Sequence, residues 1–226
     1  MNYLCIIPAR LGSQRLKNKN MKIIGGKPLI FWTISLAIKC KFFSKIVVST
    51  DSDKIKKYCK KFKLDVIDRP KNLSLNSSKM DHVINHTLDH YRKKNTHFDS
   101  IALLQPTSPL RTLRTINAAC KKFNKDIYDT LVSVEKLDHK STPDKLFRIK
   151  NFNNALRDFK YPTTQIKNYY KLDGGVIFIK KIDKFKKSLL SGKTSFIEVT
   201  YPESIDIDNL QDFIQAKYYL KSYEKN

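Results

Sequence analysis

Acidic residues are scarce in this chain of 226 residues. Asp and Glu number 21 against 44 Lys and Arg, which leaves a formal net charge of +23. A surplus of this size points to anionic partners, such as nucleic acid, a membrane surface or a phosphorylated small molecule. The alternative is that the lysine-rich composition has no functional meaning. The even spread of lysines along every predicted helix is consistent with this alternative.

Spacings typical of metal sites, disulfides and membrane segments are missing as well. The four cysteines form no C-x-x-C pair, which argues against a zinc site or a disulfide framework. The first apolar run, Leu4–Ile7, is broken by Pro8 and Arg10 and is too short for a signal peptide or a membrane span, which needs about 20 residues. We therefore expect a cytoplasmic protein with reduced, mostly buried thiols and no membrane partner.

Glycine-rich phosphate loops are also absent, because the chain has only 6 glycines. Gly12 stands alone where a dinucleotide fingerprint needs three, and Gly25-Gly26-Lys27 lacks the first glycine and the Ser or Thr of a P-loop. A phosphate chain bound after the first strand would therefore depend on cationic side chains. The loop there carries Arg10, Arg15, Lys17 and Lys19. The alternative is an ordinary solvated basic loop.

Short apolar runs alternate with stretches of helical period along most of the chain. The expected strands are Leu4–Ile7, Ile46–Ser49, Asp65–Ile67, Ser100–Leu104 and Thr130–Val134. The expected helices are Pro28–Lys39, Asp53–Phe62, Ser78–Lys94 and Leu113–Phe123. This order predicts a three-layer, doubly wound α/β fold with a mainly parallel sheet, as a single domain over residues 1–226. Such sheets bind ligands beyond the carboxyl ends of their strands, where the basic loop lies.

The alternation fails over residues 141–172, which are polar and rich in tyrosine and turn residues. We expect an inserted arm, a lid or an oligomer contact there. A strand at Gly175–Ile179 then resumes the sheet, and a last helix is expected to begin at Asp208. Its expected apolar face consists of Leu210, Phe213, Ile214 and Tyr218.

Two aspartates, Asp206 and Asp208, lie two positions apart in "SIDID" at residues 204–208. In an extended segment this spacing puts both carboxylates on one face, about 7 Å apart, where they could share a hydrated Mg²⁺. The alternative is that Asp208 caps the last helix. Metal binding is the better interpretation, because capping explains one aspartate and leaves Asp206 without a purpose.

Histidines suggest little chemistry in this sequence. His82, His86 and His90 recur every four residues on a predicted helix, a spacing that could bind a metal. No H-E-x-x-H pattern or cysteine partner accompanies them, so a polar helix face is the better interpretation. No Ser-His-Asp arrangement can be argued either, and no general base is assigned.

Four stretches in order, covering nearly the whole chain, resemble a known enzyme family. They are "IIPARLGSQRLKNKN" at 6–20, "VSTDSDKI" at 48–55, "LLQPTSPLR" at 103–111 and "SIDID" at 204–208. Together they resemble the acylneuraminate cytidylyltransferases, the CMP-sialic acid synthetases, whose fold is Rossmann-like. The resemblance implies a Mg²⁺-dependent transfer of CMP from CTP to a 2-keto sugar acid, sialic acid or a related nonulosonic acid, with release of pyrophosphate.

The resemblance also implies roles for individual residues. Arg10 and Lys19 would act in catalysis and hold the triphosphate, with Ser13 and Asn20 bonding alongside. Arg69 matches a position near the nucleotide, although an ordinary surface arginine is an equal alternative. The implied sugar contacts are Gln105, Lys145 and Asp173, and the implied catalytic Mg²⁺ ligands are Asp206 and Asp208. A homodimer is implied as well, with an arm formed by about residues 141–172.

The sequence departs from the family pattern in the region expected to determine sugar specificity. Family members commonly read N-G-A-I-Y-I where this chain has "GGVIFI" at 174–179, so Gly174 replaces an asparagine. An arginine expected in the preceding segment is replaced by Thr163, which leaves Lys167 or Lys171 to bind a carboxylate. Met80 stands where a small hydroxyl residue is frequent near the base.

Three alternative functions accompany this interpretation. A CMP-Kdo synthetase would use an eight-carbon acid, but its opening loop lacks the ending seen at Lys19-Asn20. A basic nucleic-acid-binding protein would need a clustered basic stripe with interleaved aromatics, whereas these basic residues are dispersed, so no nucleic-acid partner is expected. A catalytically silent relative is disfavoured by the presence of Arg10, Lys19, Asp206 and Asp208.

Overall fold

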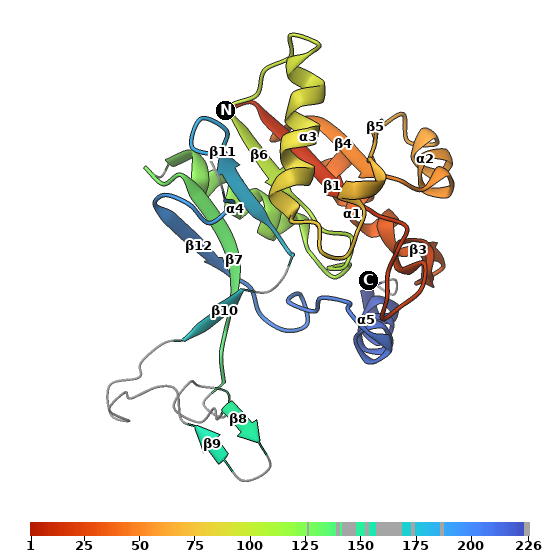
Figure 1. Cartoon of the computed structure of the whole chain (residues 1–226), viewed down its shortest axis with the longest axis vertical. Coiled ribbons are helices and arrows are strands. Elements are labelled where there is room, and N and C mark those ends of the chain that lie inside the picture. The colour runs from red at the N-terminus through yellow and green to blue at the C-terminus, as the bar shows by residue number, and fades with distance from the viewer. Residues whose placement is uncertain are drawn as a thin grey trace.

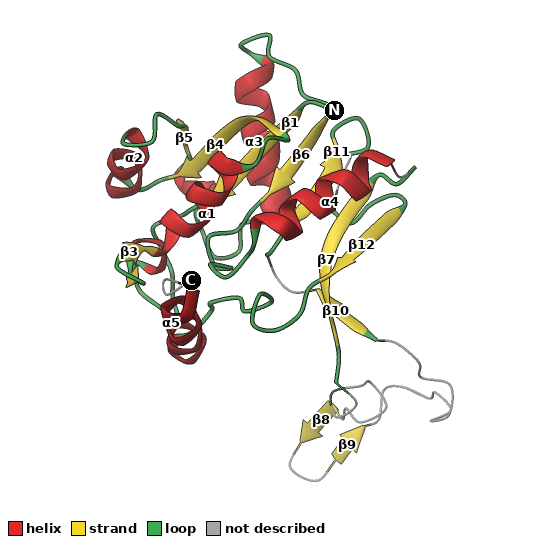
Figure 2. Cartoon of the chain, turned by 180° about the vertical axis from the view of Figure 1, so that it is seen from behind, coloured by secondary structure: helices red, strands yellow, loops and turns green. Residues whose placement is uncertain are grey.

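The fold is built on one eight-stranded sheet with helices on both faces (Figures 1 and 2). The computed structural model describes residues 1–125, 127–138, 141, 148–151, 154–156, 169–172, 175–185 and 188–223. The strand order is β10-β7-β11-β6-β1-β4-β5, and β12 also pairs with β7. The strands are β1 Tyr3–Pro8, β4 Phe43–Thr50, β5 Asp65–Asp68, β6 Ser100–Leu103, β7 Thr130–Lys136, β10 Tyr170–Leu172, β11 Phe178–Lys181 and β12 Thr194–Glu198.

The described helices are α1 Leu29–Lys39, α2 Asp53–Lys60, α3 Met80–Arg92, α4 Leu113–Lys125 and α5 Leu210–Tyr223. Two short 3₁₀ turns occupy Lys19–Met21 and Lys71–Leu73. None of these helices has the length and apolar character needed to cross a bilayer. All four cysteines are buried and free.

The sheet is mixed but mainly parallel. The central strand β1 runs parallel to β4 and β6, β4 runs parallel to β5, and β12 runs parallel to β7. The strand after the irregular stretch departs from the expected pattern, because β11 lies antiparallel between β6 and β7 and begins at Phe178 rather than Gly175. The short strands β10 and β12 were not expected from the sequence at all.

Alternation along β1 explains the three layers. Cys5 and Ile7 pack with residues of α1, α2 and α4 on one face of the sheet, whereas Leu4 and Ile6 pack with residues of α3 on the other. Successive strand side chains point to opposite faces, so a strand covered on both sides reads as a continuous apolar run. The doubly wound α/β fold expected from the sequence is confirmed.

A third, smaller core joins the two ends of the chain. Leu16 of the opening loop packs here with Ile205 and Ile207 and with Ala216 and Leu220 of α5. Of the four residues expected on the apolar face of this helix, Phe213 packs against this core, whereas Leu210, Ile214 and Tyr218 are more than half exposed and that part of the prediction is wrong. The buried row is Phe213, Ala216 and Leu220, and it is set by contact with the opening loop.

Within residues 141–172, the described part contains an antiparallel hairpin of β8 Arg148–Asn151 and β9 Asn154–Leu156, and the strand β10. Regular structure therefore occurs in a stretch where the sequence suggested none. The expected dimerisation arm lies largely outside the described residues and stays a prediction.

The buried arginine Arg111 holds the loop after β6 against the segment before β11. Its guanidinium donates to the carbonyl oxygens of Gln105 (2.8 Å), Gly175 (2.6 Å) and Val176, and to the hydroxyl of Thr33 (3.0 Å). Arg111 is 3% exposed. One buried side chain therefore gives three backbone carbonyl oxygens a charge-assisted hydrogen bond.

Replacing Arg111 with methionine should therefore destabilise the fold. We expect Arg111→Met to lower the free energy of unfolding by about 3 kcal/mol, because several backbone carbonyls lose a buried, charged donor at once. The measurement is urea unfolding followed by circular dichroism. Arg114→Met, at an exposed position near the start of α4, is the matched control and should change stability by less than about 0.5 kcal/mol. Equal stability of the two variants would contradict this role for Arg111.

Candidate active site

A cavity of about 470 Å³ lies at the carboxyl ends of β1, β5 and β6. Its walls come from the opening loop, the loops after β5 and β6, and the segment before α5. The lining residues are Pro8, Arg10, Ser13, Gln14, Arg15, Leu16, Lys19, Asn20, Arg69, Leu73, Leu75, Asn76, Ser78, Met80, Val83, Gln105, Pro106, Thr107, Asp206 and Asp208. Ligands of open α/β sheets bind at this edge, so this cavity is the candidate active site.

Arg69 is a buried cation in the cavity wall. It is 5% exposed, and its guanidinium donates to the hydroxyl and the carbonyl oxygen of Ser49 at 3.2 and 2.7 Å. Burial lowers the pKa of Arg69 to about 10, and the nearby Arg10 acts in the same direction, while Asp51 opposes them. The side chain therefore stays charged at neutral pH, and the surface alternative for Arg69 is wrong. A desolvated cation facing a cavity favours an anionic ligand.

The opening loop is fixed by Asn20. This residue is 7% exposed, and its side-chain amide donates to the carbonyl oxygen of Arg10 at 3.0 Å. Arg10 in turn donates to the carbonyl oxygen of Ser74 at 3.3 Å, which joins the loop after β1 to the loop after β5. Asn20 thus holds the backbone that presents the cations, a role that the sequence did not indicate. Ser13 lies on the cavity wall as expected.

The two aspartates share one face of an extended segment. Ile205 and Ile207 point into the third core, whereas Asp206 and Asp208 line the cavity. This alternation is the one that the period of two predicted. Ile207 is tied to the loop after β6 by its N–H, which donates to the carbonyl oxygen of Thr107 at 2.8 Å. Both carboxylates therefore face the cations Arg10 and Lys19 across the cavity.

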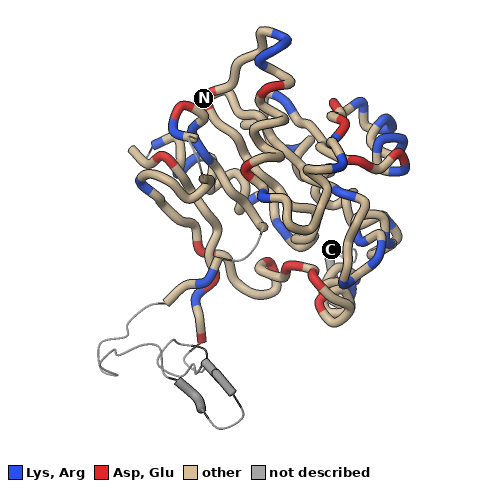
Figure 3. The backbone as a smooth tube through the Cα atoms, viewed as in Figure 1, with Lys and Arg blue, Asp and Glu red and all other residues tan. Residues whose placement is uncertain are grey.

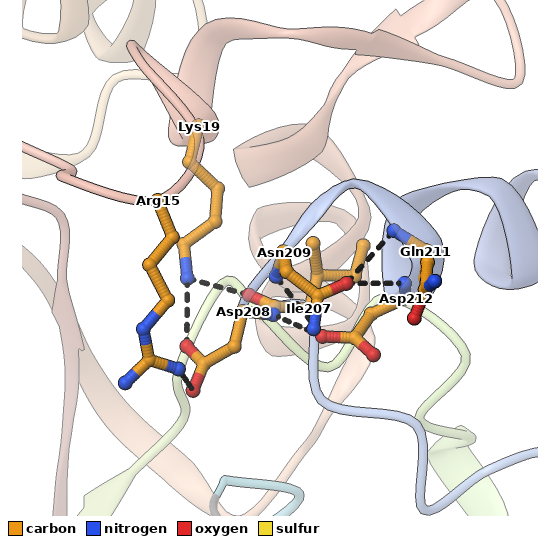
Figure 4. A network of polar contacts seen from close by, with 7 residues as sticks. All are labelled: Arg15, Lys19, Ile207, Asp208, Asn209, Gln211 and Asp212. Atoms are coloured by element: carbon orange, nitrogen blue, oxygen red, sulfur yellow. Dashed lines mark hydrogen bonds and ion pairs between the residues drawn. The ribbon is translucent and has the colours of Figure 1, made fainter.

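Other residues cap the last helix. The side-chain oxygen of Asn209 accepts from the N–H groups of Gln211 and Asp212, and the carboxylate of Asp212 accepts from the N–H groups of Asp208 and Asn209 (Figure 4). This is a reciprocal cap, which satisfies the first N–H groups of the helix. The capping interpretation of Asp208 is therefore wrong, and its carboxylate instead pairs with Arg15 (2.9 Å) and Lys19 (3.2 Å).

A second cavity of about 480 Å³ meets the first at Arg15, Asp206 and Asp208, which line both. Its other walls are formed by Glu135, Lys171, Leu172, Tyr201, Ser204, Ile205, Asn209, Asp212 and Gln215. The ammonium of Lys171 pairs with Glu135 at 3.0 Å. The walls of this cavity combine cationic, polar and apolar side chains. The sequence did not predict this cavity.

Gln105 lies in the first cavity, on a loop that approaches the backbone at Gly175. A Cβ built on Gly175 would lie 2.9 Å from the Cβ of Gln105 and 3.2 Å from the hydroxyl of Ser108. Such an approach excludes any other residue unless the loop shifts. Gly175 therefore positions Gln105. In the sequence, the glycine itself within "GGVIFI" is the only sign of this close contact.

Several expected site residues cannot be placed. Lys145 and Asp173, the other implied sugar contacts, lie outside the described residues, as do Thr163, Lys167 and Gly174. The histidines at 82, 86 and 90 lie along α3, the first exposed and the others half-buried. Among the described residues, no group of three or more His, Cys, Asp or Glu side chains could hold a metal.

The positive charge is dispersed over the molecule. Figure 3 shows Lys and Arg on helices and loops of every part of the described chain, with Asp and Glu scattered among them. No single basic stripe of the kind that tracks a nucleic-acid backbone is visible in this view.

Comparison with known proteins gives a consistent result. A family model described as cytidylyltransferase matches residues 4–223. The chain is 32% identical to CMP-N,N'-diacetyllegionaminic acid synthase of Legionella pneumophila, with 94% of each chain covered, and 31% identical to N-acylneuraminate cytidylyltransferase of Escherichia coli. The Escherichia coli match covers 93% of this chain and 50% of the relative. Matches to N-acylneuraminate cytidylyltransferases of Streptococcus agalactiae cover 52% of those relatives, so this chain spans about half the length of these proteins.

Among solved structures, a CMP:2-keto-3-deoxy-manno-octonic acid synthetase complexed with CTP has the same fold. The TM-score is 0.73 at 17% identity, with 99% of this chain and 100% of that chain covered. Fold, site and sequence agree, and the match over nearly all of its length shows that this chain belongs to the cytidylyltransferase family.

Proposed function

We propose that this protein transfers CMP from CTP to the anomeric hydroxyl of a 2-keto sugar acid of the sialic or legionaminic acid type. The observation that carries the proposal is the meeting of Arg10, Lys19 and Arg69 with Asp206 and Asp208 in one cavity. Relatives named for sialic, legionaminic and pseudaminic acids support this class of acceptor.

The triphosphate of CTP would lie against the cations of the opening loop. Arg10 and Lys19 would neutralise its phosphate oxygens, and Ser13 would donate a hydrogen bond from the same loop. Buried Arg69 would lie nearby as a desolvated positive charge, where its attraction for an anion is least screened. Negative charge grows on the leaving pyrophosphate during transfer, so preorganised cations lower the barrier.

Asp206 and Asp208 would hold Mg²⁺. Their carboxylate oxygens are the hard donors that this ion prefers, and both face the cavity where a phosphate chain would complete the coordination. When bound, Mg²⁺ would neutralise negative charge on the phosphates. The donor set therefore fits the ion.

The bond changes are simple. The hydroxyl oxygen of the acid forms a bond to the α-phosphorus, the bond from that phosphorus to the bridging oxygen breaks, and pyrophosphate leaves with the electron pair. No histidine lines either cavity in the described part of the chain. The hydroxyl proton would leave to a carboxylate that lines the cavities or to solvent.

The acid would approach the aspartates from the second cavity. Lys171 offers positive charge for its carboxylate, and Leu172 and Tyr201 offer apolar surface for the sugar ring. Gln105 lines the first cavity together with both aspartates and would orient the acid from that side.

We further propose a homodimeric, cytoplasmic enzyme. The family resemblance supports a dimer, with residues 141–172 as the arm between subunits. Within that arm, the structure describes the β8–β9 hairpin and the strand β10.

A pyrophosphate-release assay tests the proposed function. With CTP, Mg²⁺ and a panel of sialic, legionaminic, pseudaminic and eight-carbon 2-keto sugar acids, we expect release with at least one nine-carbon acid. ATP, GTP and UTP should give little release under the same conditions. Preference for the eight-carbon acid would instead support the CMP-Kdo synthetase alternative, and activity with no acid would leave the family membership but contradict the proposed reaction.

Lys19→Ala should lower turnover by about 100-fold or more, because a cation facing the triphosphate is lost. The thermal unfolding midpoint should stay close to that of the unchanged protein. Lys17→Ala is the matched control, since Lys17 is an exposed lysine of the same loop and does not line the cavity. Near-normal turnover in Lys19→Ala would rule out this role.

Lys171→Ala should raise the KM for the sugar acid by about tenfold and leave the KM for CTP unchanged, because only the second cavity loses a cation. Lys171→Arg should restore most of the affinity. Lys184→Ala provides the control, since Lys184 is similarly exposed (52% against 55%) and also paired with a carboxylate. A rise in the KM for CTP, or no change for the acid, would place the acid elsewhere.

A further inference from the structure

Both oxygens of the Asp208 carboxylate contact cations of the opening loop. Lys19 contacts its Oδ1 at 3.2 Å, and Arg15 contacts its Oδ2 at 2.9 Å (Figure 4). Each carboxylate oxygen therefore already has a positively charged partner. A metal ion that approaches Asp208 therefore competes with both cations for the carboxylate.

The two cations differ in how firmly they are held. The side chain of Lys19 is 13% exposed, and its ammonium also donates to the carbonyl oxygen of Ile207 at 2.5 Å. Arg15 is 70% exposed and comes from a loop without regular structure. An exposed ion pair contributes little stability, so Arg15 is the partner that moves at small cost.

A free metal ion finds a poor site in this arrangement. Asp206 and Asp208 are the two carboxylates on the wall of the first cavity, and Mg²⁺ sites with so few protein ligands are completed by substrate phosphates. The neighbouring Arg15 and Lys19 repel a cation that arrives alone. A metal–triphosphate complex carries net negative charge, so the same cations attract it.

We propose that Arg15 exchanges partners during substrate binding: it shields Asp208 from free metal, and it moves to the phosphate oxygens when the nucleotide arrives with its metal. The inference rests on the proposed function. A guanidinium bonds phosphate and carboxylate oxygens with the same fork of N–H groups, so the exchange replaces one charged hydrogen bond with another. Oδ2 of Asp208 is released when the metal arrives. Arg15 is therefore a positioning residue that couples metal binding to nucleotide binding.

The test is a titration with Mn²⁺ alone, followed by electron paramagnetic resonance, on the full chain without nucleotide or sugar acid. Mn²⁺ takes the same oxygen ligands as Mg²⁺. Arg15→Ala should bind Mn²⁺ about threefold to fivefold more tightly than the unchanged protein, because the competing ion pair is gone. Lys17→Ala removes the same charge from the same loop, at a residue outside the cavity lining, and should leave the affinity unchanged.

Two further arms make the result specific. Adding Asp206→Asn to Arg15→Ala should abolish the gain, which places the metal at the aspartate pair. With CTP present, Mn²⁺ affinity should rise in the unchanged protein, and this rise should be smaller in Arg15→Ala, because coupling between two ligands is reciprocal.

Three results would overturn the inference. They are equal Mn²⁺ affinity in Arg15→Ala and the unchanged protein, an equal gain in Lys17→Ala, and no measurable Mn²⁺ binding in any variant. Equal affinities in the first arm concern Arg15 alone, because that arm contains neither substrate. Failure of the proposed function would appear instead as absent pyrophosphate release.

Discussion

The contact of Lys19 with the segment around Asp208 joins the first loop of the chain to its last helix. The ammonium bonds a backbone carbonyl 188 residues away and pairs with the carboxylate that follows it. Beneath this contact, Leu16 packs with Ile205 and Ile207 in the third core. Apolar packing thus holds the two segments together, and their charged residues are left facing one cavity. The rest of the site is built around this junction.

Buried arginines shape the remainder of the cavity. Arg69 and Arg111 are both almost fully buried, and both donate to backbone carbonyl oxygens at the carboxyl edge of the sheet. Arg111 holds the loop that carries Gln105 and leaves its charge within the scaffold, whereas Arg69 presents a charge to the cavity. The two buried arginines therefore have different roles, because Arg111 is bonded to backbone within the scaffold and Arg69 lines the cavity.

The large net charge is distinct from the charge that matters at the site. Most Lys and Arg residues are spread over the described surface, where water and salt screen them. The few cations in the cavity lie close to carboxylates and partly out of water, where their charges are screened less. The local arrangement of Arg15, Lys19 and Asp208 carries more functional meaning than the total of +23.

Local patterns were enough to predict much of this molecule. The buried strands β1, β4, β5, β6 and β7 and the helices α1 to α4 follow from apolar runs and helical period, because these depend on neighbours close in sequence. The shared face of Asp206 and Asp208 follows from the period of two in an extended chain. The resemblance of four motifs indicated the same family as the comparisons.

Long-range contacts settled the remaining features. The direction of β11 depends on pairing with β6 and β7, and the buried face of α5 depends on contact with the opening loop. Local periodicity in the sequence therefore predicts neither feature. From the sequence alone, Arg69 resembles an ordinary surface arginine, and only the folded structure shows its bond to Ser49. Asp208 likewise resembles a helix cap in the sequence, but Asn209 and Asp212 form the cap in the structure. A residue's burial and partners depend on segments far away in the chain, and these meet only when the chain is folded.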